Sequence, residues 1–316
     1  MMQRTDTTET TEAAGVPVAT ADERVAATEE QRAEGFDLPD APGPEDTPPG
    51  VEPLAPAEVI RLPARHNATL TRVLAAVNAD ADLHAIWRCQ NVTAVDRLGM
   101  SDHGPVHMQI VANLALRLLR LLTGKGVEPS IVRDHGLGRD DAEVVVTLAA
   151  LLHDSGMSIH RDDHERMSLF VALPKLQELL APAYPDPAAR RVLVSETLHA
   201  IITHRSGGRP LTLEAGVVRL ADALDMSQGR ARIAFTAGHV NIHSVSAAAI
   251  EKVTIGPGEE KPVCVDIRMS NAAGIFQIDE LLGDKLKGSG LEPYVEVTAG
   301  VSGETDRRLF ETLKFD

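Results

Sequence analysis

Residues 141–156 read Asp141-Ala-Glu-Val-Val-Val-Thr-Leu-Ala-Ala-Leu-Leu-His-Asp-Ser-Gly156, and this stretch decides the fold. From Val144 to Leu152 the residues are almost all apolar, so a helix here is apolar on every side and belongs in the middle of a helical bundle. The helix ends in His153-Asp154. A buried carboxylate is costly unless a positive group compensates it, and the partial negative charge of a helix C-terminus adds to that cost. A divalent cation and a buried salt bridge are both open explanations.

Around this helix, the apolar periodicity predicts an all-helical domain over residues 101–232. Glycine and proline residues separate its segments, and Asp140–Glu143 is a plausible capping box for the central helix. Residues 57–100 are predicted to form a helical lead-in that packs on this core. The predicted helices of the domain span residues 105–123, 141–154, 164–180, 188–204 and 212–226.

The pattern then changes, and residues 233–316 are predicted to form a small α+β domain. Apolar and polar residues alternate over 253–255 and 263–267 around Gly256-Pro-Gly258, which is typical of a hairpin. We expect this domain to pack on the helical domain, to close its cleft or to form a contact between two copies of the chain. A helix and a further strand are predicted over residues 275–286 and 294–298.

Residues 1–56 are predicted to be a disordered acidic leader. Residues 1–55 hold 13 acidic residues against three arginines, which accounts for −10 of the chain's net charge of −15. They contain almost no large apolar side chains, so they cannot offset the entropy lost on ordering. The predicted fold class is therefore mainly α: a helical bundle with a C-terminal α+β unit and an acidic leader.

The composition argues against several classes of function. The net charge is −15 and only 3% of the residues are aromatic, so we expect neither extended nucleic acid nor a membrane as a partner. Cys89 and Cys264 lie far apart in sequence, which fits a reducing compartment and excludes a disulfide framework or a thiolate zinc site. The first residues show no signal peptide and no apolar run is long enough to cross a bilayer, so we expect a cytoplasmic protein.

Further histidine and aspartate residues stand where successive helices could deliver them to one place. His107 opens an amphipathic run that faces the core, and His160 and His164 have the spacing of one helical turn. His204 ends a helix with an apolar face, and Asp222 is an inward carboxylate on another apolar helix. A helical bundle can gather such side chains around an interior metal ion.

Imidazole and carboxylate ligands without thiolate predict one or two divalent metal ions, of the kind Mn, Fe, Co, Ni or Zn, with Mg as a further option. Such ions bind phosphate oxygens, neutralise charge and lower the pKa of a bound water. The ligand set is therefore suited to the hydrolysis of a phosphate ester.

These residues resemble the pattern of the HD-domain metal-dependent phosphohydrolases. That pattern has a histidine on one helix, a His-Asp pair closing the next long helix, intervening histidines, and a distant aspartate in an Ala-Asp context. His107, the pair His153-Asp154, His204 and Asp222 match it in order within residues 100–230. The resemblance implies an all-helical fold and a metal-dependent phosphohydrolase activity.

The resemblance also implies roles for single residues. Asp154 would bridge to a second ion held by His204 and by His160 or His164. Asp154 would also be catalytic, and His160 or His164 would protonate the leaving oxygen. The residues implied to bind the first ion are His107, His153, Asp154 and Asp222.

The sequence departs from the family pattern at one position. Family members often have a lysine directly after the glycine of the His-Asp element, and Met157 stands there. We expect Arg161 or Arg205 to contact the phosphate instead, because a guanidinium group binds phosphate through two hydrogen bonds. Asp225, one turn beyond Asp222, would support a metal ligand.

We therefore expect a metal-dependent phosphohydrolase whose substrate is a small phosphate mono- or diester, nucleotide-like as is common in such families. Two alternatives stay open. One is a sensor that binds a metal or a nucleotide on the same scaffold without turnover, which the methionine at position 157 favours. The other is a structural adaptor with incidental histidines. Metal content separates the adaptor from the other two, and turnover separates the enzyme from the sensor.

Overall fold

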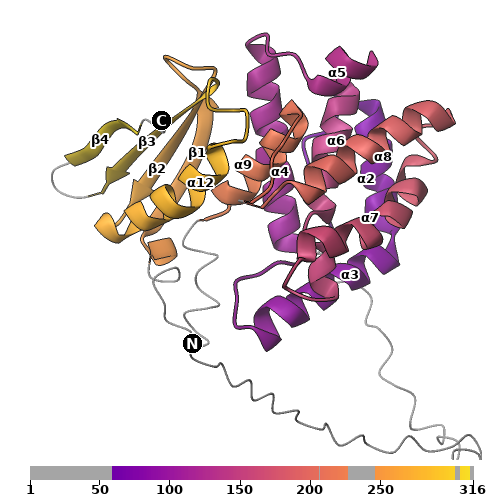
Figure 1. The fold of residues 1–316 in the computed structure, drawn as a ribbon, viewed down its shortest axis with the longest axis horizontal. Coiled ribbons are helices and arrows are strands. Elements are labelled where there is room, and N and C mark those ends of the chain that lie inside the picture. The colour runs from indigo at the N-terminus through magenta and orange to yellow at the C-terminus, as the bar shows by residue number, and fades with distance from the viewer. Residues whose placement is uncertain (1–58, 206, 227–245, 303–306, 314–316) are drawn as a thin grey trace, which may run out of the picture. The chain divides into compact units, whose positions relative to one another are not determined.

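The central helix of the computed structural model is α6 (Arg139–Leu152), in which every residue from Ala142 to Leu152 is buried. It packs against α4 (Pro105–Gly124), α8 (Pro187–Ile202) and α9 (Leu213–Leu224), as Figure 1 shows. This position agrees with the prediction from its apolar surface.

The start of α6 differs from the prediction. The helix begins at Arg139 rather than at residue 141, and the Asp141 carboxylate accepts a hydrogen bond from the N–H of Gly138 at 2.8 Å. Asp141 thus supplies one half of a capping box to Gly138, which has no side chain to return the bond, and the motif does not lie within Asp140–Glu143. The reason is that the extended backbone of Gly138 already provides the N-cap.

The predicted leader, residues 1–56, lies outside the part of the chain that the structure describes, and so does the predicted domain boundary near residue 232. Within the described part the fold is mostly helical with one small sheet, which confirms the predicted fold class. The described residues are 59–205, 207–226, 246–302 and 307–313.

Further helices surround α6, and polar side chains define where several of them begin. The side chains of Asn67, Asp80 and Thr212 accept N–H groups at the starts of α2, α3 and α9. These hydrogen bonds satisfy donors that have no partner inside the first turn. The surrounding helices are α2 (Ala68–Ala79), α3 (Ala81–Asn91), η2 (Val92–Arg97), α5 (Ser130–His135), η3 (Ser155–Ser158) and α7 (His164–Leu180).

A four-stranded sheet follows the helices, with its strands in the order β1-β2-β3-β4. The β1–β2 and β3–β4 pairs are antiparallel and the β2–β3 pair is parallel. The chain crosses from β2 to β3 through η4 (Ala272–Gly274), η5 (Gln277–Gly283) and α12 (Asp284–Leu286), where one helix was predicted. The strand β4 was not predicted. The strands are β1 (Ile250–Pro257), β2 (Val263–Met269), β3 (Val295–Val301) and β4 (Arg307–Leu313).

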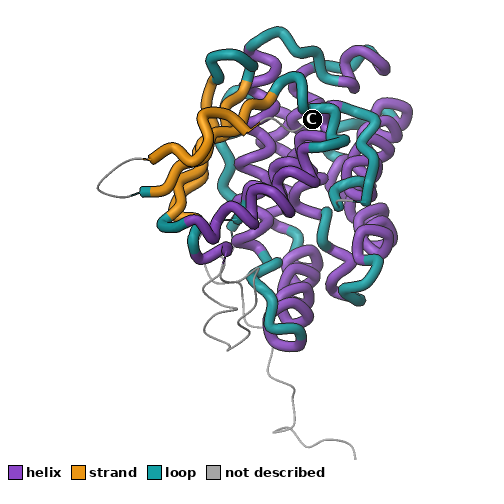
Figure 2. Tube along the Cα trace, turned by 60° about the vertical axis from the view of Figure 1, so that its left-hand side comes forward, coloured by secondary structure: helices purple, strands orange, loops and turns teal. Residues whose placement is uncertain are grey.

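The sheet and the helices share one hydrophobic core, and Figure 2 shows the sheet beside the helices rather than among them. β1 and β2 contact α4, while η5 and α12 contact α9. This arrangement places α12 against the helix that carries Asp222. No helix among the described residues has the length and apolarity needed to cross a bilayer.

Candidate metal centre

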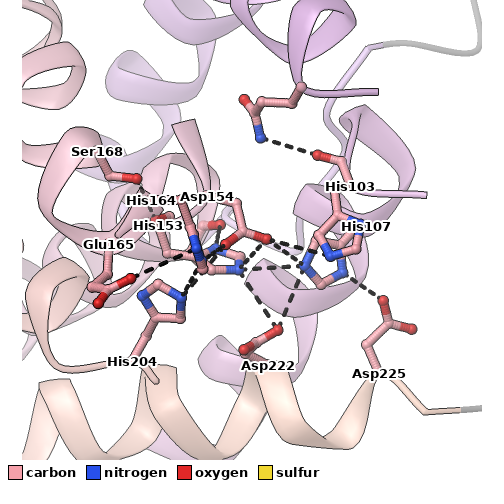
Figure 3. Close-up of polar contacts among 12 residues, drawn as sticks. His103, His107, His153, Asp154, His164, Glu165, Ser168, His204, Asp222 and Asp225 are labelled. Atoms are coloured by element: carbon pink, nitrogen blue, oxygen red, sulfur yellow. Dashed lines mark hydrogen bonds and ion pairs between the residues drawn. The ribbon is translucent and has the colours of Figure 1, made fainter. Parts of the chain in front are cut away.

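Six of the predicted ligand residues meet at one place inside the helical domain (Figure 3). Each lies at or next to the end of a helix, so the ends of five helices form the site. Three of these ends are C-termini, whose partial negative charge attracts a cation. The residues are His107 in the first turn of α4, His153 and Asp154 directly after α6, His164 at the start of α7, His204 just after α8, and Asp222 in the last turn of α9.

The first group of ligand atoms comes from His107, His153, Asp154 and Asp222. The two Nε2 atoms of His107 and His153 are 3.3 Å apart. Asp154 Oδ2 lies 3.6 Å from His107 Nε2 and 3.3 Å from His153 Nε2. Asp222 Oδ1 lies 3.5 Å and 3.6 Å from the same two atoms. Two imidazole nitrogens and two carboxylate oxygens thus face one small volume.

The second group uses the other oxygen of Asp154. Asp154 Oδ1 lies 3.0 Å from His164 Nε2 and 3.5 Å from His204 Nε2, and these two nitrogens are 3.3 Å apart. Asp154 therefore presents one oxygen to each group. A carboxylate placed in this way could supply one oxygen to each of two cations.

The Nδ1 atoms of three histidines are bonded away from the centre. His107 Nδ1 lies 2.6 Å from Asp225 Oδ2. His153 Nδ1 and His204 Nδ1 lie 2.8 Å and 2.7 Å from the carbonyl oxygens three residues earlier, Ala150 O and Ile201 O. These oxygens only accept hydrogen bonds, so each Nδ1 is the donor. In a neutral ring, Nε2 then carries the lone pair. A histidine needs this ring form to bind a metal through Nε2.

This pattern of protons fits a bound cation. His107 Nε2 faces His153 Nε2 at 3.3 Å, and two lone pairs at that distance repel unless a proton or a cation lies between them. The buried carboxylate oxygens around them also require a proton or a cation to offset their negative charge. In each of the three overlapping triads that these residues form, the ligand atoms lie within 4.8 Å of one another. The donor set, imidazole and carboxylate without thiolate, suits a divalent transition metal.

The charges of the cluster shift its pKa values. Burial alone would raise the pKa of both aspartates, but at Asp154 the charge of His153 together with hydrogen bonds from His107, His153 and His164 outweighs burial and holds the pKa well below the usual range. The Lys285 ammonium and the ring of His153 do the same for the pKa of Asp222. Against the effect of burial, the carboxylates raise the pKa of His153 to about 10. Burial lowers the pKa of His204 to about 4. Without a metal, the cluster keeps a proton on His153 at neutral pH.

Local sequence fixes the segment that carries His107. Asp102 Oδ1 accepts the N–H groups of Gly104 and His107 at 3.1 and 3.2 Å, and Asn91 Nδ2 donates to Asp102 Oδ2 at 2.6 Å. A Cβ at Gly104 would lie 2.5 Å from Asn91 Nδ2, so a side chain at this N-cap position would displace the amide that holds Asp102. Pro105 then occupies the first turn, where its missing N–H is harmless.

Ser168 of α7 holds the His-Asp element in place. Its hydroxyl donates to His153 O at 2.6 Å and accepts the N–H of Gly156 at 2.8 Å. A Cβ at Gly156 would lie 2.1 Å from His164 O and 2.4 Å from Ser168 N. The close approach of η3 to α7 therefore depends on a glycine, and it brings His164 to Asp154.

The structure does not bring His160 to the centre. Its side chain is 66% exposed and its nearest charged neighbour is Asp162, at 4.0 Å. Arg161 and Arg205 lie close to the second group without touching Asp154 in the contacts described: Arg161 Nη1 is 2.8 Å from His164 Nδ1, and Arg205 Nη1 is 3.2 Å from Glu165 Oε2.

Two residues near the centre were not among the predicted site residues. Lys285 of α12 pairs with Asp222 Oδ2, and nothing in the sequence connects these positions, which are 63 residues apart. His103 Nε2 lies 3.9 Å from Asp154 Oδ2. The i, i+4 spacing of His103 and His107 is the sequence feature that indicates a place for His103 near the centre.

Two of three comparisons with known proteins found a match. A family model described as the HD domain matches residues 106–227. The uncharacterized protein MJ1020 of Methanocaldococcus jannaschii is 45% identical over 231 residues, which are 73% of this chain and 88% of that protein. The comparison with solved structures found no match.

The fold and the site define a class: a helical bundle that presents histidine and aspartate side chains for divalent metals at its helix ends. The chain belongs to the HD-domain superfamily, a superfamily of metal-dependent phosphohydrolases.

Proposed function

We propose that this chain is a metal-dependent phosphohydrolase that cleaves a phosphate mono- or diester, with nucleotide-like compounds as the expected substrate class. The observation that carries the proposal is the convergence of four Nε2 atoms on Asp154, with Asp222 closing the first group. Membership of the HD-domain superfamily supports the same activity.

The predicted ligands form two groups, one for each of two ions. His107, His153, Asp154 and Asp222 would hold one ion, and Asp154 with His164 and His204 would hold the second. Divalent ions at such positions supply Lewis-acid polarisation of a phosphate group and lower the pKa of water. The chain keeps the ligands fixed through Asp225 and the backbone carbonyl oxygens. Burial of His153 and Asp154 strengthens every electrostatic interaction there.

The test is hydrolysis of an aryl phosphate and a bis-aryl phosphate with added Mn²⁺ or Co²⁺, followed by a screen of nucleotides. We expect turnover that depends on the metal and that falls to background in Asp154→Asn, with the fold unchanged by circular dichroism. Asp134→Asn, which removes a carboxylate that pairs with Arg133 at the surface, is the matched control and should keep full activity.

One observation favours the sensor as a second candidate. Met157, at the position where the resemblance implies a lysine, is fully buried, so it offers no charge to a phosphate. A sensor would bind metal in the stoichiometry of the ligand groups and would bind nucleotides without converting them. Metal binding without turnover of any phosphate ester in the screen would decide for the sensor and against the enzyme.

A further inference from the structure

A lysine of the C-terminal unit reaches the metal centre. Lys285 Nζ donates a hydrogen bond to Asp222 Oδ2. The other oxygen of this carboxylate, Oδ1, faces His107 Nε2 and His153 Nε2 at 3.5 and 3.6 Å. A single carboxylate group therefore separates the ammonium from the imidazole nitrogens of the first ligand group.

The ion pair is more exposed to solvent than the histidines of the first ligand group. The side chains of Lys285 and Asp222 are 17% and 14% exposed, whereas those of His107 and His153 are 1% and 0% exposed. The ammonium is therefore more accessible to a solvent-borne molecule than the two histidine rings are. The ammonium has three donors, and in the contacts among the described residues Asp222 uses one of them, which leaves donors for a further acceptor.

Helix α9 holds Lys285 at two points. Arg219 lies one turn before Asp222, and its Nε donates to Lys285 O at 2.8 Å while its Nη2 donates to Asp284 O at 2.9 Å. The Arg219 side chain is buried and also donates to Arg205 O at 2.8 Å. Arg219 thus fixes the backbone of Lys285, and Asp222 fixes its ammonium. A cation held in this way is positioned before any ligand arrives.

We propose that Lys285 binds the phosphate group of the substrate beside the metal centre. The inference rests on the proposed function, since it assigns the C-terminal unit a part in binding the ester that the centre would cleave. An ammonium ion is a common phosphate ligand in proteins because it acts as a compact point charge. It also stabilises the negative charge that the transferred phosphoryl group carries.

The experiment measures binding of inorganic phosphate to the Mn²⁺-loaded full chain by calorimetry, together with metal content and steady-state kinetics on an aryl phosphate. Lys285→Met removes the charge, and Lys285→Gln removes the charge but can still donate to Asp222. Lys285→Arg restores a cation. Lys252→Met, an exposed lysine on β1, is the matched control for the loss of one positive charge from the same unit.

We expect Lys285→Met and Lys285→Gln to weaken phosphate binding by about tenfold or more, the usual effect of losing a charge-assisted hydrogen bond. The KM for the aryl phosphate should rise by a similar factor at unchanged metal content. Lys285→Arg should recover most of the phosphate affinity, and Lys252→Met should match the unmodified chain.

Three results overturn the inference: equal phosphate affinity in Lys285→Gln and the unmodified chain, loss of metal from every folded Lys285 variant, or no phosphate binding by the unmodified chain. The proposed function fails separately. If phosphate binding depends on Lys285 but no ester is hydrolysed, the phosphate contact stands and the enzyme does not. If esters are hydrolysed and Lys285→Gln leaves KM unchanged, the enzyme stands and the contact does not.

Discussion

At the scale of residues, the contact between His107 and Asp225 sets the orientation of a metal ligand, with Nδ1 and Oδ2 2.6 Å apart. In Asp225→Asn, the amide NH₂ can donate to Nδ1 and favour the ring form with its proton on Nε2, which cannot bind a metal. We expect metal affinity to fall by about 10- to 100-fold, the usual effect of losing such a partner. Titration calorimetry with Mn²⁺ checks this, with Asp134→Asn as the control. Equal affinities would show that Asp225 has no part in orienting the ring.

Metal binding should release a proton from His153. Its pKa is raised to about 10, so the ring is protonated at pH 7 in the metal-free chain and must become neutral to bind an ion. Affinity should therefore rise as the pH rises toward 10, with about one proton released per chain from this ring. Calorimetry in buffers of different ionisation enthalpy counts that proton. A metal affinity that does not change between pH 6 and 9 would contradict this assignment.

The sequence predicted six of the side chains that the structure brings together at helix ends. His153 and Asp154 stand out because the apolar helix before them leaves no ordinary partner for a carboxylate. His160 was expected there because i, i+4 spacing puts two residues on one helix face. In the structure α7 begins only at His164, so His160 lies in the preceding loop. An i, i+4 spacing does not place two residues on one face outside a helix.

At the scale of elements, strong periodicity predicted the helices well and the C-terminal unit less well. The segment 164–180 coincides with α7. The segment 275–286 was predicted as one helix, but it divides into the π-helical η5 and the short α12. Long apolar faces determine long helices, whereas short segments depend on contacts with distant elements that no local pattern contains.

Gly156→Ala should damage the packing of η3 against α7. The added Cβ would lie 2.1 Å from His164 O and 2.4 Å from Ser168 N. Both are backbone atoms, which cannot relieve the contact by rotating away as a side chain can. We expect a loss of about 3 kcal/mol in the free energy of unfolding, as in severe overpacking, with weaker metal binding because His164 is displaced. Urea unfolding measures the loss.

The control for this substitution is Gly124→Ala. Gly124 is an exposed residue at the end of α4 with open space around its Cα. Alanine there should leave stability unchanged or raise it by about 0.5 kcal/mol. A Gly156→Ala chain as stable as the Gly124→Ala chain would show that η3 and α7 can separate freely.

At the scale of the whole molecule, the ends of helices that are distant in sequence form one centre, so a bound ion links them. With free metal at 100 times its dissociation constant, binding should add about 2.7 kcal/mol to the free energy of unfolding. For a domain of this size, this corresponds to a rise of roughly 5–10 °C in Tm. Calorimetric scans with Mn²⁺ and with a chelator measure it. In Asp154→Asn, which alters the carboxylate shared by both ligand groups, the two scans should coincide, and a metal-dependent shift there would place the stabilising ion elsewhere.

The contact between α12 and α9 could not be predicted, although packing of the C-terminal unit on the helical domain was one of the expected arrangements. The sequence indicated a separate α+β unit, but the pairing of Lys285 with Asp222 depends on how α12 packs on α9. That packing is set by apolar contacts between segments far apart in the chain, and hydrophobic contacts carry no directional signal in the sequence.

The most direct test of the central claim is anomalous diffraction from crystals of the Mn²⁺-loaded chain, collected at the manganese edge. The account predicts one peak among His107 Nε2, His153 Nε2, Asp154 Oδ2 and Asp222 Oδ1, and a second peak beside Asp154 Oδ1, His164 and His204. A loaded crystal with its anomalous peaks elsewhere, or with none at Asp154, would contradict the account.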